Sequence, residues 1–358
     1  MDANNIFEGV RVVELASVLA GPAVGNFFSE LGAEVVKVEN KNGGDVTREW
    51  RTANETKVGP SAYYSSVNWN KESIFLDFND TSDHKRLVNI IKDSDILISN
   101  FKKGDDEKFG LTYSDVRKMN PSIIYGQITG FGRESDRVAY DLILQAEAGF
   151  MSINGHPDGP PTKMPLALID LLAAHQLKEG ILCAMLARKA GEERSFLVEA
   201  SLYESAVASL INQATDWLMN GNVPQRIGSL HPNIAPYGEV FEMKDGRSIT
   251  LAIGANRQFH KLCTVLNAGE LAEDPRFINN SKRVAHRGVL YEKLKERINS
   301  FDTDSFLERM HELQIPAGEI KNIRQVFESE KIQGILLEEE IENRKTVRPK
   351  TAIFKLSE

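Results

Sequence analysis

Short apolar runs alternate with segments of helical periodicity over the first part of the chain. Residues 10–16 and 34–39 are rich in Val and flank residues 21–32, where apolar positions recur with a period near 3.6 and Pro22 suits the first turn of a helix. Further strand-like runs lie at 73–78, 95–101 and 122–131, and further helical patterns at 84–94 and 112–120. Strands that alternate with helices predict an α/β fold built on a parallel, doubly wound sheet.

A single acid, Asp170, stands between an extended apolar run and the next helical pattern. Leu177, Ile181 and Met185 lie four residues apart in that pattern, and Gly191 is suited to end the helix. An Asp at the start of a helix is typical of a cap, because its carboxylate accepts hydrogen bonds from unpaired backbone amides. The other interpretation is that Asp170 is a nucleophile, and the local pattern alone leaves both open.

The pattern changes after a second helical run at 204–221. Gly, Pro and Asn become frequent, and residues 237–243 and 248–253 form a predicted hairpin that turns at 244–247. Helical patterns follow near 256–266, 285–300 and 303–315. We therefore expect a large domain whose first part spans 1–205, a connecting helix and linker at 206–228, a small α/β domain at 229–312, and a return to the large domain at 313–358.

Length and charge limit the function classes. A chain of 358 residues is long enough for two hydrophobic cores. Its net charge of -8 argues against a nucleic-acid binder, which needs a basic surface. The apolar runs are shorter than the roughly 18 to 20 residues that span a bilayer, so we expect no membrane segment. The N-terminus lacks the pattern of a secretory signal, which predicts a cytoplasmic location.

The sequence lacks the common motifs of nucleotide-binding, hydrolytic and metal-dependent enzymes. Gly21 and Gly25 do not form G-x-G-x-x-G, and Pro22 lacks an amide that a pyrophosphate needs, although Glu39 ends the second strand where a ribose-binding acid is expected. The sequence has no nucleophile elbow and no P-loop, and its histidines have no metal-ligand spacing, so we predict no metal site. The two cysteines, Cys183 and Cys263, are interpreted as apolar fillers.

Positive charge gathers in one turn. Lys102, Lys103 and Lys108 surround the turn that follows the strand at 95–101. In an α/β sheet, ligands bind beyond the carboxyl ends of the strands. A basic turn at that position in an acidic protein favours a phosphorylated ligand.

Several segments resemble one known family in the family's own order. They include "GVRVVELASVLAGPAVGNFFSELGAEVVKVEN", "NWNKESIFLDF", "YDLILQAEAG", "LIDLLAAHQLKEGILCAMLARKAGE" and "HPNIAPYG". These blocks resemble the class III coenzyme A transferases, the formyl-CoA and carnitine type of the CaiB/BaiF family. The resemblance implies a homodimer of two interlocked chains, each with a large Rossmann-like domain that binds coenzyme A (CoA) and a smaller α/β domain.

The resemblance also implies roles for single residues. Asp170 matches the family's catalytic aspartate, which is acylated and then carries CoA as a thioester. Asn40 stands where the family has an adenine-stacking arginine, with Lys41 beside it, and Lys108 and Phe109 match a pair near the ribose phosphates. Further positions match residues along the CoA molecule, at the site entrance or beside the catalytic acid: Val18, Leu19, Ala20, Leu76, Asn100, Phe101, Arg137, Tyr140 and Leu202.

The expected function is transfer of CoA from an acyl-CoA donor to a small carboxylic acid, with CoA thioesters as substrates and no permanently bound cofactor. Amides or side chains such as Gln145 or Asn256 are candidates to stabilise the oxyanions. One alternative is a 2-methylacyl-CoA racemase of the same family, which is disfavoured because Tyr140 stands where the racemases have a histidine. Another alternative is a CoA-binding protein without catalytic activity.

Overall fold

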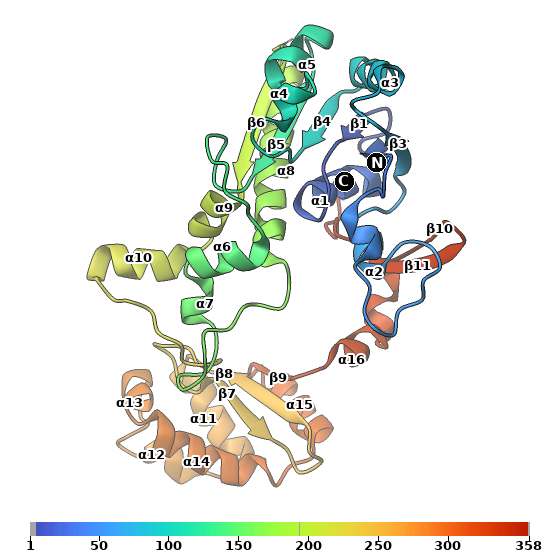
Figure 1. Cartoon of the computed structure of the whole chain (residues 1–358). Coiled ribbons are helices and arrows are strands. Elements are labelled where there is room, and N and C mark those ends of the chain that lie inside the picture. Colours follow the sequence, from blue (N-terminus) through green and yellow to red (C-terminus); the bar gives the residue numbers. More distant parts are fainter. Residues whose placement is uncertain (1–4, 193, 357–358) are drawn as a thin grey trace. The chain divides into compact units, whose positions relative to one another are not determined.

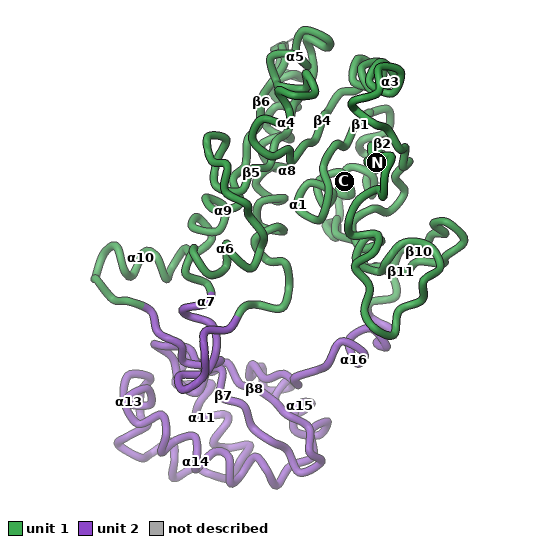
Figure 2. Tube along the Cα trace, in the orientation of Figure 1, with its two compact units in different colours: residues 1–150, 163–223, 332–358 green, residues 151–162, 224–331 purple. Residues whose placement is uncertain are grey.

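The computed structural model describes residues 5–192 and 194–356. These divide into two compact units, which Figure 2 shows in different colours. Unit 1 is made of three segments, residues 1–150, 163–223 and 332–358, and unit 2 comprises residues 151–162 and 224–331. Each unit has a sheet and a hydrophobic core of its own.

A six-stranded, fully parallel sheet forms the centre of unit 1 (Figure 1). Its strands follow the order β3-β2-β1-β4-β5-β6. They are β1 (Arg11–Glu14), β2 (Glu34–Asn40), β3 (Glu72–Leu76), β4 (Ile96–Ser99), β5 (Ile124–Thr129) and β6 (Phe196–Ser201). The order reverses between β1 and β4, and in doubly wound sheets ligands bind at this switch point beyond the carboxyl ends of the strands. The predicted α/β fold with a parallel sheet is confirmed.

Helices cover both faces of this sheet, and the strand sequences explain why. Neighbouring residues in a strand point to opposite faces, so Val12 packs in the core under α1 and α8, while Val13 packs in the core under α3 and α5. Burial on both faces requires the nearly continuous apolar runs seen in the sequence. The helices of unit 1 are α1 (Ala20–Glu30), η2 (Val46–Glu49), α2 (Ala62–Ser65), α3 (Thr81–Lys92), α4 (Asp105–Lys108), α5 (Tyr113–Met119), α6 (Asp141–Glu147), α8 (Leu168–Lys189), α9 (Leu202–Ala208) and α10 (Ile211–Asn220).

The C-terminal segment returns to unit 1 as an antiparallel hairpin, β10 (Leu336–Ile341) and β11 (Arg344–Pro349). Beyond it, Glu30 at the end of α1 accepts hydrogen bonds from the amides of Thr351 and Ala352. Arg348 also forms an ion pair with Glu30 at 2.7 Å. Residues 348–352 therefore lie beside α1, in the part of Figure 1 where this helix is labelled.

Unit 2 is a small α/β unit. Its antiparallel sheet contains β7 (Tyr237–Glu242), β8 (Ser248–Ala252) and β9 (Ala317–Glu319). The predicted hairpin between β7 and β8 is confirmed, and Gly246 in its turn has a φ of +78°. The helices of unit 2 are α11 (Asn256–Val265), α12 (Gly269–Glu273), α13 (Asn280–Ala285), α14 (Arg287–Ile298), α15 (Thr303–Glu312) and α16 (Ile323–Phe327), while α7 (Phe150–Ile153) and η3 (Glu330–Ile335) lie at the boundaries of the two units.

The unit boundaries differ from the expected domain boundaries. Residues 206–223, expected as a connecting segment, lie in unit 1, and residues 151–162 lie in unit 2. The return to unit 1 begins at residue 332 and not at 313, because β9 pairs with β8 and keeps that stretch in unit 2. Strand β6 and the β10–β11 hairpin were not expected from the sequence. In the described part of the chain, no helix is long and apolar enough to cross a membrane.

Candidate active site

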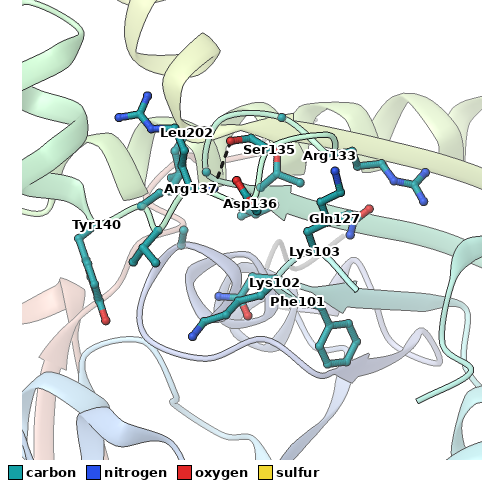
Figure 3. Close-up of a pocket in the computed structure, with 18 of the residues that line it drawn as sticks. Phe101, Lys102, Lys103, Gln127, Arg133, Ser135, Asp136, Arg137, Tyr140 and Leu202 are labelled. Carbon is teal, nitrogen blue, oxygen red and sulfur yellow. Dashed lines mark hydrogen bonds between the residues drawn. The ribbon is translucent and has the colours of Figure 1, made fainter. Parts of the chain in front are cut away.

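A cavity of about 340 Å³ opens at the carboxyl ends of β1, β4 and β5 in unit 1. Three loops line most of it: residues 17–20 after β1, residues 100–107 after β4, and residues 127–141 at the end of β5 and beyond (Figure 3). Asp170 and Leu202 complete the lining. The cavity therefore lies at the switch point of the sheet, where the topology favours a ligand.

Asp170 is the third residue of α8, so it lies within the first turn and not ahead of the helix. Its side chain makes no capping hydrogen bond, and the interpretation of Asp170 as a helix cap is therefore wrong. The cap comes instead from α6, because Oδ1 of Asp141 accepts a hydrogen bond from the amide of Ile169 at 2.7 Å. The carboxylate of Asp170 is left without a structural hydrogen bond among the described residues and faces the cavity.

Burial and the neighbouring acid Asp141 both raise the pKa of Asp170. The residue is only 9% exposed, and burial disfavours the charged form of a carboxyl group. Burial, together with the negative charge of Asp141, raises the pKa of Asp170 to about 7. A carboxylate that is poorly solvated and has no hydrogen-bond partner is a stronger nucleophile than one in water. The environment of Asp170 therefore suits an attacking oxygen.

Gln145 is not available to stabilise an oxyanion. Its side chain is fully buried, and its Nε2 donates to Oδ2 of Asp141 at 2.6 Å and to the carbonyls of Met164 and Leu166. Its Oε1 accepts from the amide of Met164 at 2.7 Å. Gln145 thus holds Asp141 and the segment before α8 in place. The other candidate, Asn256, belongs to unit 2, where its Oδ1 accepts from Arg283.

The turn between β1 and α1, which forms one wall of the cavity, is tightly held. The side chain of Asn100 bonds both backbone polar groups of Ser17, accepting from its amide at 3.1 Å and donating to its carbonyl at 2.9 Å. A Cβ atom on Gly21 would lie 2.3 Å from the Cβ of Ala16, so only glycine permits this close approach. Helix α1 has no side-chain cap, and its first residue, Ala20, lines the cavity.

Basic side chains surround the cavity, but not all of those expected from the sequence. Figure 3 shows Lys102, Lys103, Arg133 and Arg137 among the lining residues. Arg137 lies 3.9 Å above the ring of Phe131 and forms an ion pair with Glu147. Arg133 was missed because it stands among charges of mixed sign, beside Glu134 and Asp136, and not in a basic cluster.

The structure brings together nine of the fourteen residues expected at the site. The lining includes Val18, Leu19, Ala20, Asn100, Phe101, Arg137, Tyr140, Asp170 and Leu202. The other five, Asn40, Lys41, Leu76, Lys108 and Phe109, are not part of the lining among the described residues. Lys108 instead places its Nζ 4.8 Å from the centre of the Phe109 ring, and Lys41 pairs with Asp83 at 3.1 Å. Their contacts with CoA stay predictions.

Glu39 ends β2 but is not free to bind a ribose. Arg48 donates to both of its carboxylate oxygens at 2.6 Å, and Tyr64 and the amide of Asp45 also donate to it. These contacts hold the pKa of Glu39 at about 2 despite its burial. Both carboxylate oxygens of Glu39 are therefore engaged by groups of the protein itself. In the described part of the chain, no group of His, Cys, Asp and Glu is arranged to hold a metal ion.

Comparisons with known proteins identify the family of the chain. The family model of CoA-transferase family III matches residues 7–358. The chain is 36% identical to a succinate–glutarate CoA-transferase of Agrobacterium fabrum over 91% of this chain and 82% of the relative. It is 34% identical to the succinyl-CoA:glutarate CoA-transferase of Homo sapiens, over 95% of this chain and 78% of that protein. The crystal structure of a CaiB/BaiF family protein from Brucella suis matches 98% of this chain and 93% of that chain with a TM-score of 0.86 and 34% identity. The chain therefore belongs to CoA-transferase family III and is an enzyme that transfers coenzyme A.

Proposed function

We propose that this enzyme transfers CoA through a covalent thioester on Asp170. The observation that carries the proposal is the state of this carboxylate, which is nearly buried, has no hydrogen-bond partner among the described residues, and lines the cavity at the switch point. Because Asp141 caps α8, the carboxylate of Asp170 is not needed as a cap and is free to act as a nucleophile. Its match to the catalytic aspartate of the family supports the same assignment.

The proposed reaction consists of acyl exchanges that balance without an added proton. A carboxylate oxygen of Asp170 attacks the thioester carbonyl of the donor, and the CoA thiolate leaves, which forms a mixed anhydride. The thiolate then attacks the Asp170 carbonyl of the anhydride, which releases the donor as a free carboxylate and leaves CoA on Asp170. The acceptor carboxylate attacks this thioester, and the thiolate finally attacks the acyl carbon of the acceptor, which restores Asp170.

Dicarboxylic acids are the proposed substrate class. Relatives that share 29% to 36% identity with the chain are named for succinate and glutarate, oxalate, mesaconate and D-citramalate. All of these acids carry two carboxyl groups. We therefore infer that at least one of the two exchanged acids is a small dicarboxylate, and that its CoA thioester occupies the cavity.

Trapping of the intermediate tests the mechanism. The protein is incubated with succinyl-CoA in the absence of an acceptor, digested, and analysed by mass spectrometry. CoA attached to the peptide that contains Asp170, and released by hydroxylamine, is the expected result. Attachment at another residue, or turnover without any adduct, would contradict the assignment.

The two alternatives predict different reactions. A racemase would exchange the α-proton of a 2-methylacyl-CoA with solvent, and a binding protein would retain CoA without forming any new thioester. The racemase needs a second base, and Tyr140, which stands at the histidine position, is 57% exposed at the cavity. No observation in this chain favours either alternative over transfer.

The active protein is proposed to be an interlocked homodimer. Helix α10 supports this proposal because none of its residues is buried and it exposes four large apolar side chains: Ile211, Trp217, Leu218 and Met219. Exposed apolar surface of this kind is typical of an interface. The cytoplasmic location stays a prediction.

A further inference from the structure

Four charged side chains form a buried charge cluster behind the turn between β1 and α1. They are Glu14, Lys37, Asp45 and Lys71. Lys37 lies between two acids, 2.9 Å from Glu14 and 3.1 Å from Asp45, and Lys71 lies 2.7 Å from the second oxygen of Glu14. Each of these side chains is at most 1% exposed. The proposed acyl exchanges use none of these groups, so the cluster needs a separate explanation.

Asp45 connects this cluster to the wall of the cavity. Its Oδ2 accepts a hydrogen bond from the amide of Val18 at 3.1 Å, although the two residues are 27 positions apart. Its Oδ1 accepts from the amide and the hydroxyl of Thr47, at 3.0 and 2.7 Å. The carboxylate is therefore fixed in direction by its own loop, and one of its oxygens is aimed at Val18.

Val18 has a backbone conformation that its side chain disfavours. Its φ is +73°, in the left-handed region, where a β-branched residue is a rare outlier. Strain of this type shifts the balance between two loop conformations by roughly tenfold to a hundredfold. It persists only where the surroundings hold the backbone in place. Val18 also lines the cavity, so its conformation determines the shape of that wall.

The two sides of the turn are held by different residues. Asn100 holds the amide and carbonyl of Ser17 from β4, and Asp45 holds the amide of Val18 from the opposite side. Lys37 supports both parts, because its Nζ also donates to the carbonyl of Ala16 at 2.9 Å. A hydrogen bond to a charged carboxylate is about twice as strong as a neutral one.

We propose that Asp45 is a positioning residue, which keeps Val18 in its strained conformation and so keeps the cavity wall in the shape that accepts CoA. This inference rests on the proposed function only in that the ligand of the cavity is a CoA thioester. Asp45 does not touch the substrate in this role. Its effect reaches the site through the backbone of Val18.

Glycine at position 18 provides the test, because glycine adopts a positive φ without strain. The variants are Asp45→Ala, Val18→Gly and the double variant. Ser61→Ala is the matched control, because Ser61 is fully buried and bonds the carbonyl of Thr47 in the same loop without contacting Asp45 or Val18. Binding of free CoA is measured by calorimetry, and KM and kcat are measured where the transfer reaction is detected.

Asp45→Ala is expected to weaken CoA binding and raise KM by about tenfold or more, with a much smaller change in kcat. Val18→Gly removes a side chain that lines the cavity and is expected to weaken binding by itself, but Asp45→Ala should cause little further loss in that background, so the two effects are not additive. Ser61→Ala should lower stability without changing affinity. If Asp45→Ala does not fold, Asp45→Asn, which keeps an acceptor oxygen, should show a smaller loss that also largely disappears in the Val18→Gly background.

A loss of affinity from Asp45→Ala that is equally large with valine and with glycine at position 18 would overturn the proposal, because a general destabilisation is not relieved by glycine at position 18. An unchanged affinity in Asp45→Ala would also overturn it. If the original protein fails to bind CoA at all, the proposed function fails instead. In that case the thermal unfolding of the original protein, the two single variants and the double variant still measures whether Asp45 and Val18 are coupled. Additive changes in stability would reject the positioning role.

Discussion

Asp141 caps the helix that carries Asp170: its Oδ1 accepts the amide hydrogen of Ile169 at 2.7 Å, one residue before the proposed nucleophile. Because Asp141 supplies the cap, the carboxylate of Asp170 needs no structural hydrogen bond. The same negative charge also adds to the effect of burial and raises the pKa of Asp170. One residue therefore orients the first turn of α8 and makes its carboxylate more basic.

Asp170→Asn is expected to abolish transfer. The amide keeps the size of the side chain but cannot form the anhydride, so kcat should fall by about three orders of magnitude or more. Asp136→Asn is the matched control, because Asp136 also lines the cavity and is exposed. Transfer is followed by chromatography of the new CoA thioester. Full activity of Asp170→Asn would leave the proposed mechanism without its nucleophile.

Asp170→Asn should also make the folded protein more stable, relative to the original protein, at alkaline pH than at acidic pH. The pKa of Asp170 is about 7 in the folded protein and about 3.9 in an unfolded chain, so the folded form binds the proton more tightly. Protonation of Asp170 then stabilises the fold fully below about pH 4, and this contribution is lost as the pH rises through 7. The loss between pH 5 and pH 8 is on the order of 2 to 3 kcal/mol, and it is absent in Asp170→Asn.

Urea unfolding at several pH values measures this difference. The stability of Asp170→Asn relative to the original protein should rise from pH 5 to pH 8 and stay level above that. Asp136→Asn should show no such trend. A constant difference across the range would mean that Asp170 titrates near its ordinary value and is better solvated than the structure indicates.

The pH profile of the reaction should report the same carboxyl group. Only ionised Asp170 attacks the thioester, so kcat/KM should rise with pH and level off above about pH 7 to 8. Asp141→Asn removes the neighbouring negative charge and should move this rise to lower pH. Asp141→Glu retains the charge and is the control. A shift to higher pH in Asp141→Asn would contradict the assigned electrostatic role.

Much of the fold could be predicted from the sequence because the parallel strands are buried on both faces. Burial of that kind favours continuous apolar runs, which the interior strands β1, β4 and β5 show. Strand β6 was missed because it is a half-buried edge strand with Glu199 near its centre. The β10–β11 hairpin was missed for a related reason: it carries charged residues on its exposed face and lacks a strong apolar pattern.

The site was predicted through family resemblance and topology, and tertiary contacts decided the rest. The sequence places Asp170 near the start of a helix but does not show that Asp141 reaches it from another helix. The basic turn after β4 was located correctly, yet the sequence does not show which of its lysines faces the cavity. The strained φ of Val18 has no sequence signal, because valine is the residue least expected in that conformation.

The proposed interlocked homodimer predicts that subunits do not exchange. Light scattering at micromolar concentration should give the mass of two chains, and a mixture of tagged and untagged dimers should form no hybrid without denaturant. Trp217→Ser on the exposed face of α10 should reduce the yield of folded dimer, whereas Val58→Ser, at an exposed position in the loop before α2, should not. A folded, active monomer would contradict the proposed interlocked homodimer.

Lys102, which lines the cavity, should contribute more to CoA affinity than Lys108, which does not. Lys102 is exposed, so its proposed contact with a phosphate of CoA is screened by solvent, and Lys102→Ala should raise KM for the acyl-CoA by roughly threefold to tenfold and leave kcat nearly unchanged. The effect should shrink at high salt because screening weakens the contact in the original protein.

Lys108→Ala is the matched control in the same turn, with its ammonium group over Phe109. Titration of KM against salt for both variants measures the difference. A larger effect of Lys108→Ala at low salt would place the phosphates on the Phe109 side of the turn, as the family resemblance implies, and would reject the assignment to Lys102.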